Sequence, residues 1–383
     1  MRIKSVLSRI KLMVNYPSDI KYLKYSNEAK NGIVLVIHES KRLGASLLLL
    51  RIAEEMVKQG EKVYIISKTF GELNNEYEKV APVQIVLNNN QMKNTLSKLC
   101  DDGFERILVN TVSAGDTVPI AKELGFYCVS LIHELEYVIK LLHLEEKAKM
   151  MIENSKEIVF STSVAQEEVL KYLGLQSVET KIRPQGIYYQ KPEEDIITRR
   201  VEELIKQYPI IKDKFVVIGV GNTTHRKGFD LFVETAEKTP SAMFLWCGGK
   251  ENYYNEIMAN RNLTNFIYLG KMNAEELSGV YQLADCMLMS SRKDTLPSII
   301  FEALLFGTPV IGSKDSGGII DIINERNGIL TDSADANQFS KAIQYLMKDN
   351  KHIILSDSIK SMDLINLRFD NYVEWLLSLY RNK

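Results

Sequence analysis

Short apolar strands alternate with stretches able to form helices, and this alternation limits the fold of the chain more than any other feature. In the first half, apolar segments stand at residues 32–37, 62–66, 83–87, 106–110, 127–132 and 157–161. After a charged stretch at 191–200, apolar segments recur at 215–220, 243–247, 265–269, 286–289 and 309–312. Continuous apolar strands separated by helices favour parallel sheets that are covered on both faces.

The two runs predict two doubly wound α/β domains, residues 1–195 and 196–367, that face each other across a cleft. A chain of 383 residues is long enough for two domains that each bury a core. Ligands of open parallel sheets bind beyond the carboxyl ends of the strands, so the cleft is the expected site. Residues 369–380 follow with the apolar spacing of an amphipathic helix.

The strongest functional signal is the segment Asp294-Thr-Leu-Pro-Ser-Ile-Ile-Phe-Glu302, which follows an apolar strand. Pro297 suits the start of a helix, because its φ is fixed and it has no N–H to leave unpaired. Phosphate or sugar oxygens bind well beside such a helix start, to the N–H groups of Leu296, Ser298 and Ile299. Glu302 lies about one turn further on, where its carboxylate can accept hydrogen bonds from hydroxyls of the same ligand.

This segment resembles the donor site of the retaining glycosyltransferases of family 4 (glycosyl transferases group 1), which have the GT-B fold. Their hallmark is a Glu, seven residues, and a second Glu that opens an EA-x-x-x-G-x-P-V stretch. Residues 302–310 match the second half in type and spacing. The resemblance implies that Glu302 binds the ribose of a nucleotide. It also implies that Asp294, which stands where the family usually has Glu, binds the transferred sugar with a shorter reach.

A glycine-bearing turn at residues 219–228 also resembles the family. Glycine allows the backbone to approach a phosphate closely, and Gly221 is therefore a donor-binding candidate. The resemblance implies that Lys227 binds the diphosphate, with Arg226 as a weaker candidate, because fixed cations stabilise a leaving group as its charge develops. Asn222 stands where the family commonly has Arg.

Three further strand ends match the family in chain order. The loop at 38–45 carries R-x-G-A, which makes Gly44 a donor-side candidate and Arg42 an acceptor-side candidate. The strand end at His133 and Glu134 resembles the family's "HE" segment, so His133 is expected near the reacting sugar and Glu134 on the acceptor side. The turn at Gly248 and Gly249 is expected beside the nucleotide. The resemblance also implies that the closing segment 368–383 crosses back onto the first domain.

The implied reaction is transfer of a sugar, with retention of anomeric configuration, from a nucleotide diphosphate sugar to a hydroxyl acceptor in bacterial-type polysaccharide or glycolipid assembly. The sequence identifies no carboxylate as a covalent nucleophile, which favours a front-face displacement that relies on positioning and charge stabilisation. The catalytic candidates are His133, Lys227 and Asp294. No cofactor is expected, and no metal ion, because an Asp-x-Asp motif is missing.

Two alternatives share these features. A GT-B nucleotide-sugar epimerase would have the same domains but release a changed nucleotide sugar without an acceptor. A non-catalytic sugar-binding or scaffold relative would keep only the fold, and the departures at Asp294 and Asn222 leave room for it. The missing G-x-G-x-x-G fingerprint disfavours a dehydrogenase. The net charge of −1 gives no argument for nucleic acid.

A cytoplasmic location is expected. The four cysteines are scattered, as in a reducing compartment, and neither a membrane-spanning apolar run nor the apolar block of a secretory signal is evident. Residues 1–14 combine apolar positions at helical spacing with basic residues elsewhere on the wheel. Such a helix can lie in a membrane interface, which suits a lipid-linked acceptor and a peripheral position on the inner face. Docking of the helix on its own domain would explain the pattern equally well.

Overall fold

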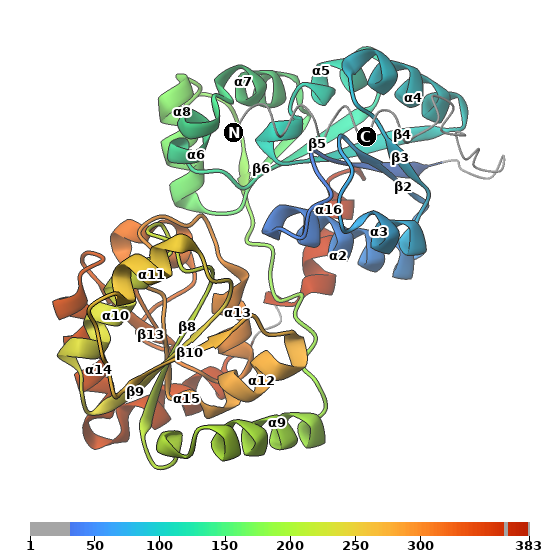
Figure 1. Cartoon of the computed structure of the whole chain (residues 1–383). Coiled ribbons are helices and arrows are strands. Elements are labelled where there is room, and N and C mark those ends of the chain that lie inside the picture. Colours follow the sequence, from blue (N-terminus) through green and yellow to red (C-terminus); the bar gives the residue numbers. More distant parts are fainter. Residues whose placement is uncertain (1–30, 364–366, 382–383) are drawn as a thin grey trace.

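Two α/β domains, each built on a parallel sheet, make up the part of the chain that the computed structural model describes, residues 31–363 and 367–381 (Figure 1). The first sheet has the strand order β3-β2-β1-β4-β5-β6-β7, and the second has the order β10-β9-β8-β11-β12-β13. In both sheets the order reverses beside the first strand along the chain, which makes them doubly wound. The predicted fold class is therefore confirmed.

The first sheet consists of β1 (Gly32–Ile37), β2 (Val63–Ser67), β3 (Val83–Ile85), β4 (Phe104–Asn110), β5 (Tyr127–Ile132), β6 (Glu157–Phe160) and β7 (Lys181–Ile182). Its helices are α2 (Gly44–Lys58), α3 (Asn74–Val80), α4 (Asn89–Asp101), α5 (Thr117–Glu123), α6 (Glu136–Leu142), α7 (Glu145–Asn154) and α8 (Ser163–Leu173). Buried side chains cover both faces of the sheet in two separate clusters, as expected for parallel strands.

The second sheet consists of β8 (Phe215–Val220), β9 (Ala242–Cys247), β10 (Phe266–Gly270), β11 (Cys286–Leu288), β12 (Val310–Ser313) and β13 (Gly328–Thr331). Its helices are α9 (Glu194–Gln207), α10 (Phe229–Lys238), α11 (Asn252–Met258), α12 (Ala274–Leu283), α13 (Ser298–Leu305), α14 (Ala336–Met347) and α15 (Lys351–Ser361). Two buried clusters again cover its faces. Because β1 and β8 are central, the segments that leave their carboxyl ends lie near the middle of each domain's edge.

Two segments cross between the domains side by side. The first joins β7 to α9, and the second leads from α15 to α16 (Phe369–Ser378). The N–H of Ile187 donates to the carbonyl of Leu367 at 2.7 Å, and Ile187 pairs with Arg368 in a parallel bridge. The expected boundary between residues 195 and 196 falls in the first turn of α9, and the domain limits stay a prediction.

The closing helix α16 packs on the first domain, beside α2 (Figure 1). Tyr372, Val373 and Leu376 are buried in the apolar cluster that covers one face of the first sheet together with α2. Beyond the helix, the hydroxyl of Tyr380 donates to the carbonyl of Ile107 at 2.9 Å. The helix therefore returns to the first domain, as expected.

The amphipathic pattern predicted at residues 1–14 lies outside the described residues. No described helix combines the length and the apolar composition that a membrane span requires.

Candidate active site

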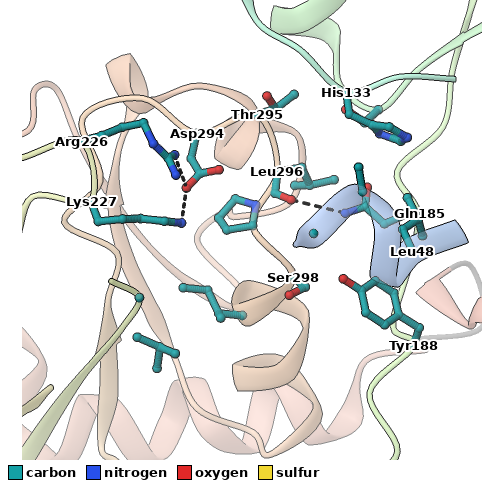
Figure 2. A pocket seen from close by; sticks show the side chains of 17 residues that line it. Leu48, His133, Gln185, Tyr188, Arg226, Lys227, Asp294, Thr295, Leu296 and Ser298 are labelled. Atoms are coloured by element: carbon teal, nitrogen blue, oxygen red, sulfur yellow. Dashed lines mark hydrogen bonds and ion pairs between the residues drawn. The ribbon is translucent and has the colours of Figure 1, made fainter. Parts of the chain in front are cut away.

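Both domains contribute to a cavity of about 360 Å³. It is lined by Gly44, Ala45, Leu48, His133 and Ser161 of the first domain, by Gln185 and Tyr188 of the crossing segment, and by Val220, Gly221, Arg226, Lys227, Asp294, Thr295, Leu296, Pro297, Ser298 and Ile299 of the second. In Figure 2, Arg226 and Lys227 point at Asp294 on one side, and His133 and Gln185 lie on the other. The structure thus gathers nine of the predicted site residues around one cavity.

The two cations and the carboxylate of Asp294 form a cluster on the wall of the second domain. Lys227 Nζ hydrogen-bonds Asp294 Oδ2, and Arg226 Nη1 lies 3.2 Å from the same oxygen. The side chains of Lys227 and Asp294 are 17% and 15% exposed, so this pair is largely shielded from water. One carboxylate therefore serves two cations, and the cluster carries a net charge of about +1.

Two helices begin at the cavity. Helix α2 starts at Gly44 and α13 at Ser298, and neither the Leu43 cap nor the Pro297 cap bonds its helix through a side chain. Pro297 has φ −73° and ψ 130°, which is extended backbone, so the helix begins directly after it, as predicted. The first N–H groups of each helix have no carbonyl within the helix to bond, and beside the positive ends of the dipoles they favour an anionic ligand between the two helix starts.

Glu302 lies one turn into α13, beside the cavity but outside its lining. It borders a narrow adjoining space with Tyr188 and Ser298, which also line the main cavity. Its carboxylate accepts hydrogen bonds from Tyr281 at 2.9 Å and from Ser298 at 3.2 Å. Burial raises the pKa of Glu302, although both hydroxyls favour the charged form. A ligand hydroxyl that reaches this carboxylate would compete with Ser298.

The loop that carries Asp294 is held by a turn that the sequence analysis missed. The N–H of Asp294 donates to the carbonyl of Ser316 at 2.7 Å, and the N–H of Gly318 donates to the carbonyl of Thr295 at 2.9 Å. Gly317 has φ +122°, and a Cβ there would lie 2.0 Å from the carbonyl oxygen of Asp294. The glycines of Ser316-Gly-Gly318 indicate a turn, but local sequence does not indicate that this turn pairs with the Asp294 loop.

The predicted glycines Gly248 and Gly249 do not line the cavity. They instead support the turn that does, because a Cβ at Gly248 would lie 2.0 Å from the carbonyl oxygen of Gly221. Asn222 joins the same two turns, since its Oδ1 accepts the N–H of Gly249 at 3.2 Å and its Nδ2 donates to Glu251 at 3.3 Å. Asn222 thus holds the two turns together.

His133 extends from the end of β5 to the opposite wall. Its Nε2 is 2.8 Å from Oδ1 of Asn110, and burial lowers the pKa of His133 to about 4. Glu134 is buried behind it, where its carboxylate accepts the N–H groups of Val112 at 3.1 Å and His133 at 3.0 Å. Burial raises the pKa of Glu134 to about 7, and the N–H groups oppose that shift. Glu134 does not line the cavity.

Arg42 lies on an exposed loop, where it pairs with Glu76 of α3, and it does not line the cavity. The cavity is also lined by three residues that were not predicted from the sequence, Ser161, Gln185 and Tyr188. Ser161 directly follows β6 and could have been found as a polar strand end. Gln185, whose Nε2 donates to the carbonyl of Leu296 at 3.3 Å, belongs to a crossing segment with no local signature.

Among the residues that the structure describes, no cluster of three or more His, Cys, Asp or Glu side chains is arranged to hold a metal ion.

Residues 200–360 match the family model described as glycosyl transferases group 1. The match includes Lys227, Asp294 and Glu302, and it bears out the predicted resemblance over residues 200–360.

Curated relatives align with part of the chain. An alpha-galactosylglucosyldiacylglycerol synthase of Streptococcus pneumoniae is 29% identical over 132 residues, which cover 32% of this chain and 34% of the relative. A processive diacylglycerol alpha-glucosyltransferase of Acholeplasma laidlawii is 24% identical over 164 residues, which cover 42% of this chain and 49% of the relative. The chain thus spans between about a third and a half of the length of these relatives.

Solved structures resemble the chain over both domains. Anabaena HepE in complex with UDP and glucose has a TM-score of 0.76 at 16% identity, over 92% of this chain and 100% of that one. Sucrose-phosphate synthase of Thermosynechococcus elongatus has a TM-score of 0.72 at 19% identity, over 92% of this chain and 98% of that one. At this identity the likeness shows the fold, which is the two-domain GT-B arrangement.

Proposed function

We propose that this chain, whose residues 200–360 match the group 1 glycosyl transferases, moves a sugar from a nucleotide diphosphate sugar to a hydroxyl acceptor. The observation that carries the proposal is the composition of the cavity. Lys227, Arg226 and the start of α13 line one wall, while His133 and the start of α2 line the other. Cations and free N–H groups suit a diphosphate, and the opposite wall leaves room for a neutral sugar.

The nucleoside is expected along α13. Glu302 accepts hydrogen bonds from two hydroxyls, one of which belongs to Ser298 at the edge of the cavity. A ribose, which presents two neighbouring hydroxyls, can replace Ser298 as a donor to this carboxylate. The diphosphate would then lie at the start of α13 and reach Lys227, and the sugar would lie between Asp294 and His133.

The reaction is proposed to retain the anomeric configuration and to need no metal ion. The bond between the anomeric carbon of the sugar and the diphosphate oxygen breaks, and the acceptor oxygen forms a bond to the same carbon from the same face. The acceptor proton passes to the departing phosphate oxygen, which balances the step. Lys227 and Arg226 stabilise the charge that grows on the diphosphate, and they are preorganised because Asp294 already orients them.

The proposed acceptor is a lipid-linked or glycan hydroxyl, handled at the cytoplasmic face of a membrane. The support is the alignment with a glycosyldiacylglycerol synthase and a diacylglycerol glucosyltransferase.

The test begins with binding. Thermal shift with UDP, GDP, dTDP and CMP, starting from UDP because HepE was solved with it, should identify one stabilising nucleotide. Glu302→Gln should abolish most of that shift, because the uncharged amide has one accepting oxygen for two ribose hydroxyls. The matched control is Glu325→Gln in the same domain, which should retain the shift.

The corresponding nucleotide sugar is then incubated with membrane lipids and glycan acceptors. Appearance of an α-linked product from an α-linked donor would support the proposal. Release of an altered nucleotide sugar without an acceptor would identify an epimerase instead. Binding without turnover across all acceptors would favour a non-catalytic sugar-binding protein.

A further inference from the structure

Asn110, the last residue of β4, lies fully buried between His133 and the first turn of α2. Its Nδ2 donates to the carbonyl oxygen of Ala45 at 2.8 Å, and its Oδ1 is 2.8 Å from His133 Nε2. Both neighbours, Ala45 and His133, line the cavity, whereas Asn110 does not. The amide therefore supports two parts of the cavity wall at once.

The chemistry of these partners fixes the direction of both hydrogen bonds. A carbonyl oxygen can only accept, so the atom that faces Ala45 must be the amide nitrogen of Asn110. The amide oxygen must then face His133. Because that oxygen can only accept, His133 Nε2 must carry a proton. Burial lowers the pKa of His133 to about 4, so the ring is neutral at neutral pH and Nδ1 has no proton.

We propose that Asn110 is a positioning residue that fixes His133 as the Nε2–H tautomer and leaves Nδ1 as a hydrogen-bond acceptor for a hydroxyl of the reacting sugar or acceptor. The inference rests on the proposed function, because it assigns a task to His133 within the same cavity. Within residues 31–363 and 367–381, Nδ1 has no hydrogen-bond partner. A ligand hydroxyl is the group that this atom can accept.

The surroundings of His133 favour a neutral ring. Glu134, on the same strand end, receives the backbone N–H of His133 and not its ring. Arg226, Lys227 and Asp294 belong to the opposite wall of the cavity. His38 lies beyond the neighbouring Thr111, whose hydroxyl is 3.0 Å from His38 Nδ1. Of these partners, only the amide of Asn110 contacts the ring nitrogen, so it alone sets the tautomer.

The direct test measures the tautomer in the wild-type protein by ¹⁵N NMR of labelled histidine, without any substrate. The expected result at neutral pH is a neutral His133 ring with its proton on Nε2. A ring with its proton on Nδ1, or a charged ring, would overturn the proposal. This result does not depend on turnover, so the proposal and the proposed function can fail separately.

Comparison of Asn110→Asp with Asn110→Ala tests the charge of His133, because both variants lose the donor to the Ala45 carbonyl and only Asp adds a negative charge beside the ring. The Asp carboxylate still accepts from Nε2–H but raises the pKa of His133, so at neutral pH Nδ1 becomes a donor. We expect kcat/KM to fall by about 10-fold or more near neutral pH, as for a lost hydrogen bond to the ligand, and to recover as pH rises through the new pKa. Asn110→Ala should lose activity without such recovery. The His133 ring of this variant should show both neutral tautomers.

Thr111→Val is the matched control, because it removes the neighbouring hydrogen bond to His38 at the same sheet edge. It should leave the His133 tautomer and the shape of the pH profile unchanged. If Asn110→Asp shows the wild-type pH profile while thermal denaturation shows it folded, or if Thr111→Val shifts the profile equally, Asn110 has no positioning role. If no nucleotide sugar is turned over by any variant, the proposed function fails while the NMR result stands.

Discussion

Asp294 has two neighbours that compete with any sugar for its carboxylate. It pairs with Lys227 and Arg226, and it also lines the cavity. A diphosphate that binds the two cations would release part of that pairing and free a carboxylate oxygen for a sugar hydroxyl. The shorter side chain of Asp relative to Glu is compatible with this arrangement, because Lys227 extends to meet it.

Replacement of Asp294 by Asn should therefore have opposite effects on two properties. The cations lose their counter-ion, so affinity for the free nucleoside diphosphate should rise by about 3-fold to 10-fold. Turnover should fall, because a contact with the sugar is weakened. Calorimetry and steady-state kinetics measure the two effects. Asp332→Asn, which makes the same charge change at an exposed pair with Lys314, is the control. Weaker diphosphate binding in Asp294→Asn would contradict this account.

The buried neighbours His133 and Glu134 should oppose each other in the pH dependence of stability. Burial lowers the pKa of His133 from 6.5 to about 4, so the free energy of unfolding falls as pH decreases through that window. Burial raises the pKa of Glu134 from 4.5 to about 7, so that free energy falls as pH increases through its window. The two slopes overlap and largely cancel.

Single substitutions should expose each slope. Glu134→Gln should leave a protein that loses stability as pH falls below about 6.5, and His133→Gln one that loses stability as pH rises from about 4.5 to 7. Urea denaturation across this pH range measures both. Parallel profiles for the two variants would show that the groups do not titrate as described.

At the scale of elements, the turns that follow β8 and β9 depend on each other. Gly248 has φ +140° and no room for a Cβ beside Gly221, whereas Gly270 has φ +82° with nothing within 4 Å. Both positions require left-handed backbone, but only the first also requires a close approach.

Substitutions at these two glycines distinguish the cost of a strained backbone from the cost of a clash with the neighbouring turn. Gly270→Ala should cost about 1 kcal/mol of stability, from φ alone. Gly248→Ala should cost about 3 kcal/mol or more and weaken nucleotide binding, because the turn with Gly221 must move. Denaturation and calorimetry of both variants measure these differences. Equal losses in the two variants would mean that the approach of the turns is unimportant.

Local sequence was sufficient to predict most strands and most of the residues that line the cavity wall of the second domain. The segments at 32–37, 127–132 and 215–220 were predicted at the limits that β1, β5 and β8 have. Strands β7 and β13 were missed, because one has two residues and the other, Gly328–Thr331, lacks a continuous apolar run. Short edge strands depend on their neighbour more than on their own composition.

The site was predicted only in part, because some of its contacts follow from the sheet topology and others depend on tertiary pairing. Lys227, Asp294 and Ser298 follow strands of one sheet, so their convergence could be expected from the parallel topology. The pairing of Asp294 with Gly317 and the support of Gly221 by Gly248 join distant segments through tertiary contacts. Arg42 was predicted as an acceptor-side residue from a motif alone, and its pairing with Glu76 holds its side chain away from the cavity lining.

At the scale of the whole molecule, the domains are joined by direct contacts as well as by the crossing segments. Asp321 of the second domain accepts hydrogen bonds from the N–H and hydroxyl of Ser163, at 2.6 and 2.5 Å. Ser163 begins α8 of the first domain, so the carboxylate caps a helix across the domain boundary. Asp321 lies shortly after the Gly317-Gly318 turn, which connects this contact to the Asp294 loop.

Replacement of Asp321 by Ala should loosen the two domains. The expected results are a larger radius of gyration in small-angle scattering and a higher KM for the nucleotide sugar. Asp335→Ala is the control, because Asp335 caps α14 within the second domain through the N–H groups of Asn337 and Gln338. It should cost about 1 kcal/mol of stability without a change in radius. Unchanged scattering in Asp321→Ala would show that the contact does not hold the domains together.

The most direct test of the account is a crystal structure of the protein with the nucleoside diphosphate that stabilises it. We predict a diphosphate within hydrogen-bond distance of Lys227 Nζ and of the first N–H groups of α13, with the ribose hydroxyls at Glu302. A nucleotide bound outside the cavity, or one whose diphosphate contacts neither Lys227 nor the start of α13, would contradict it.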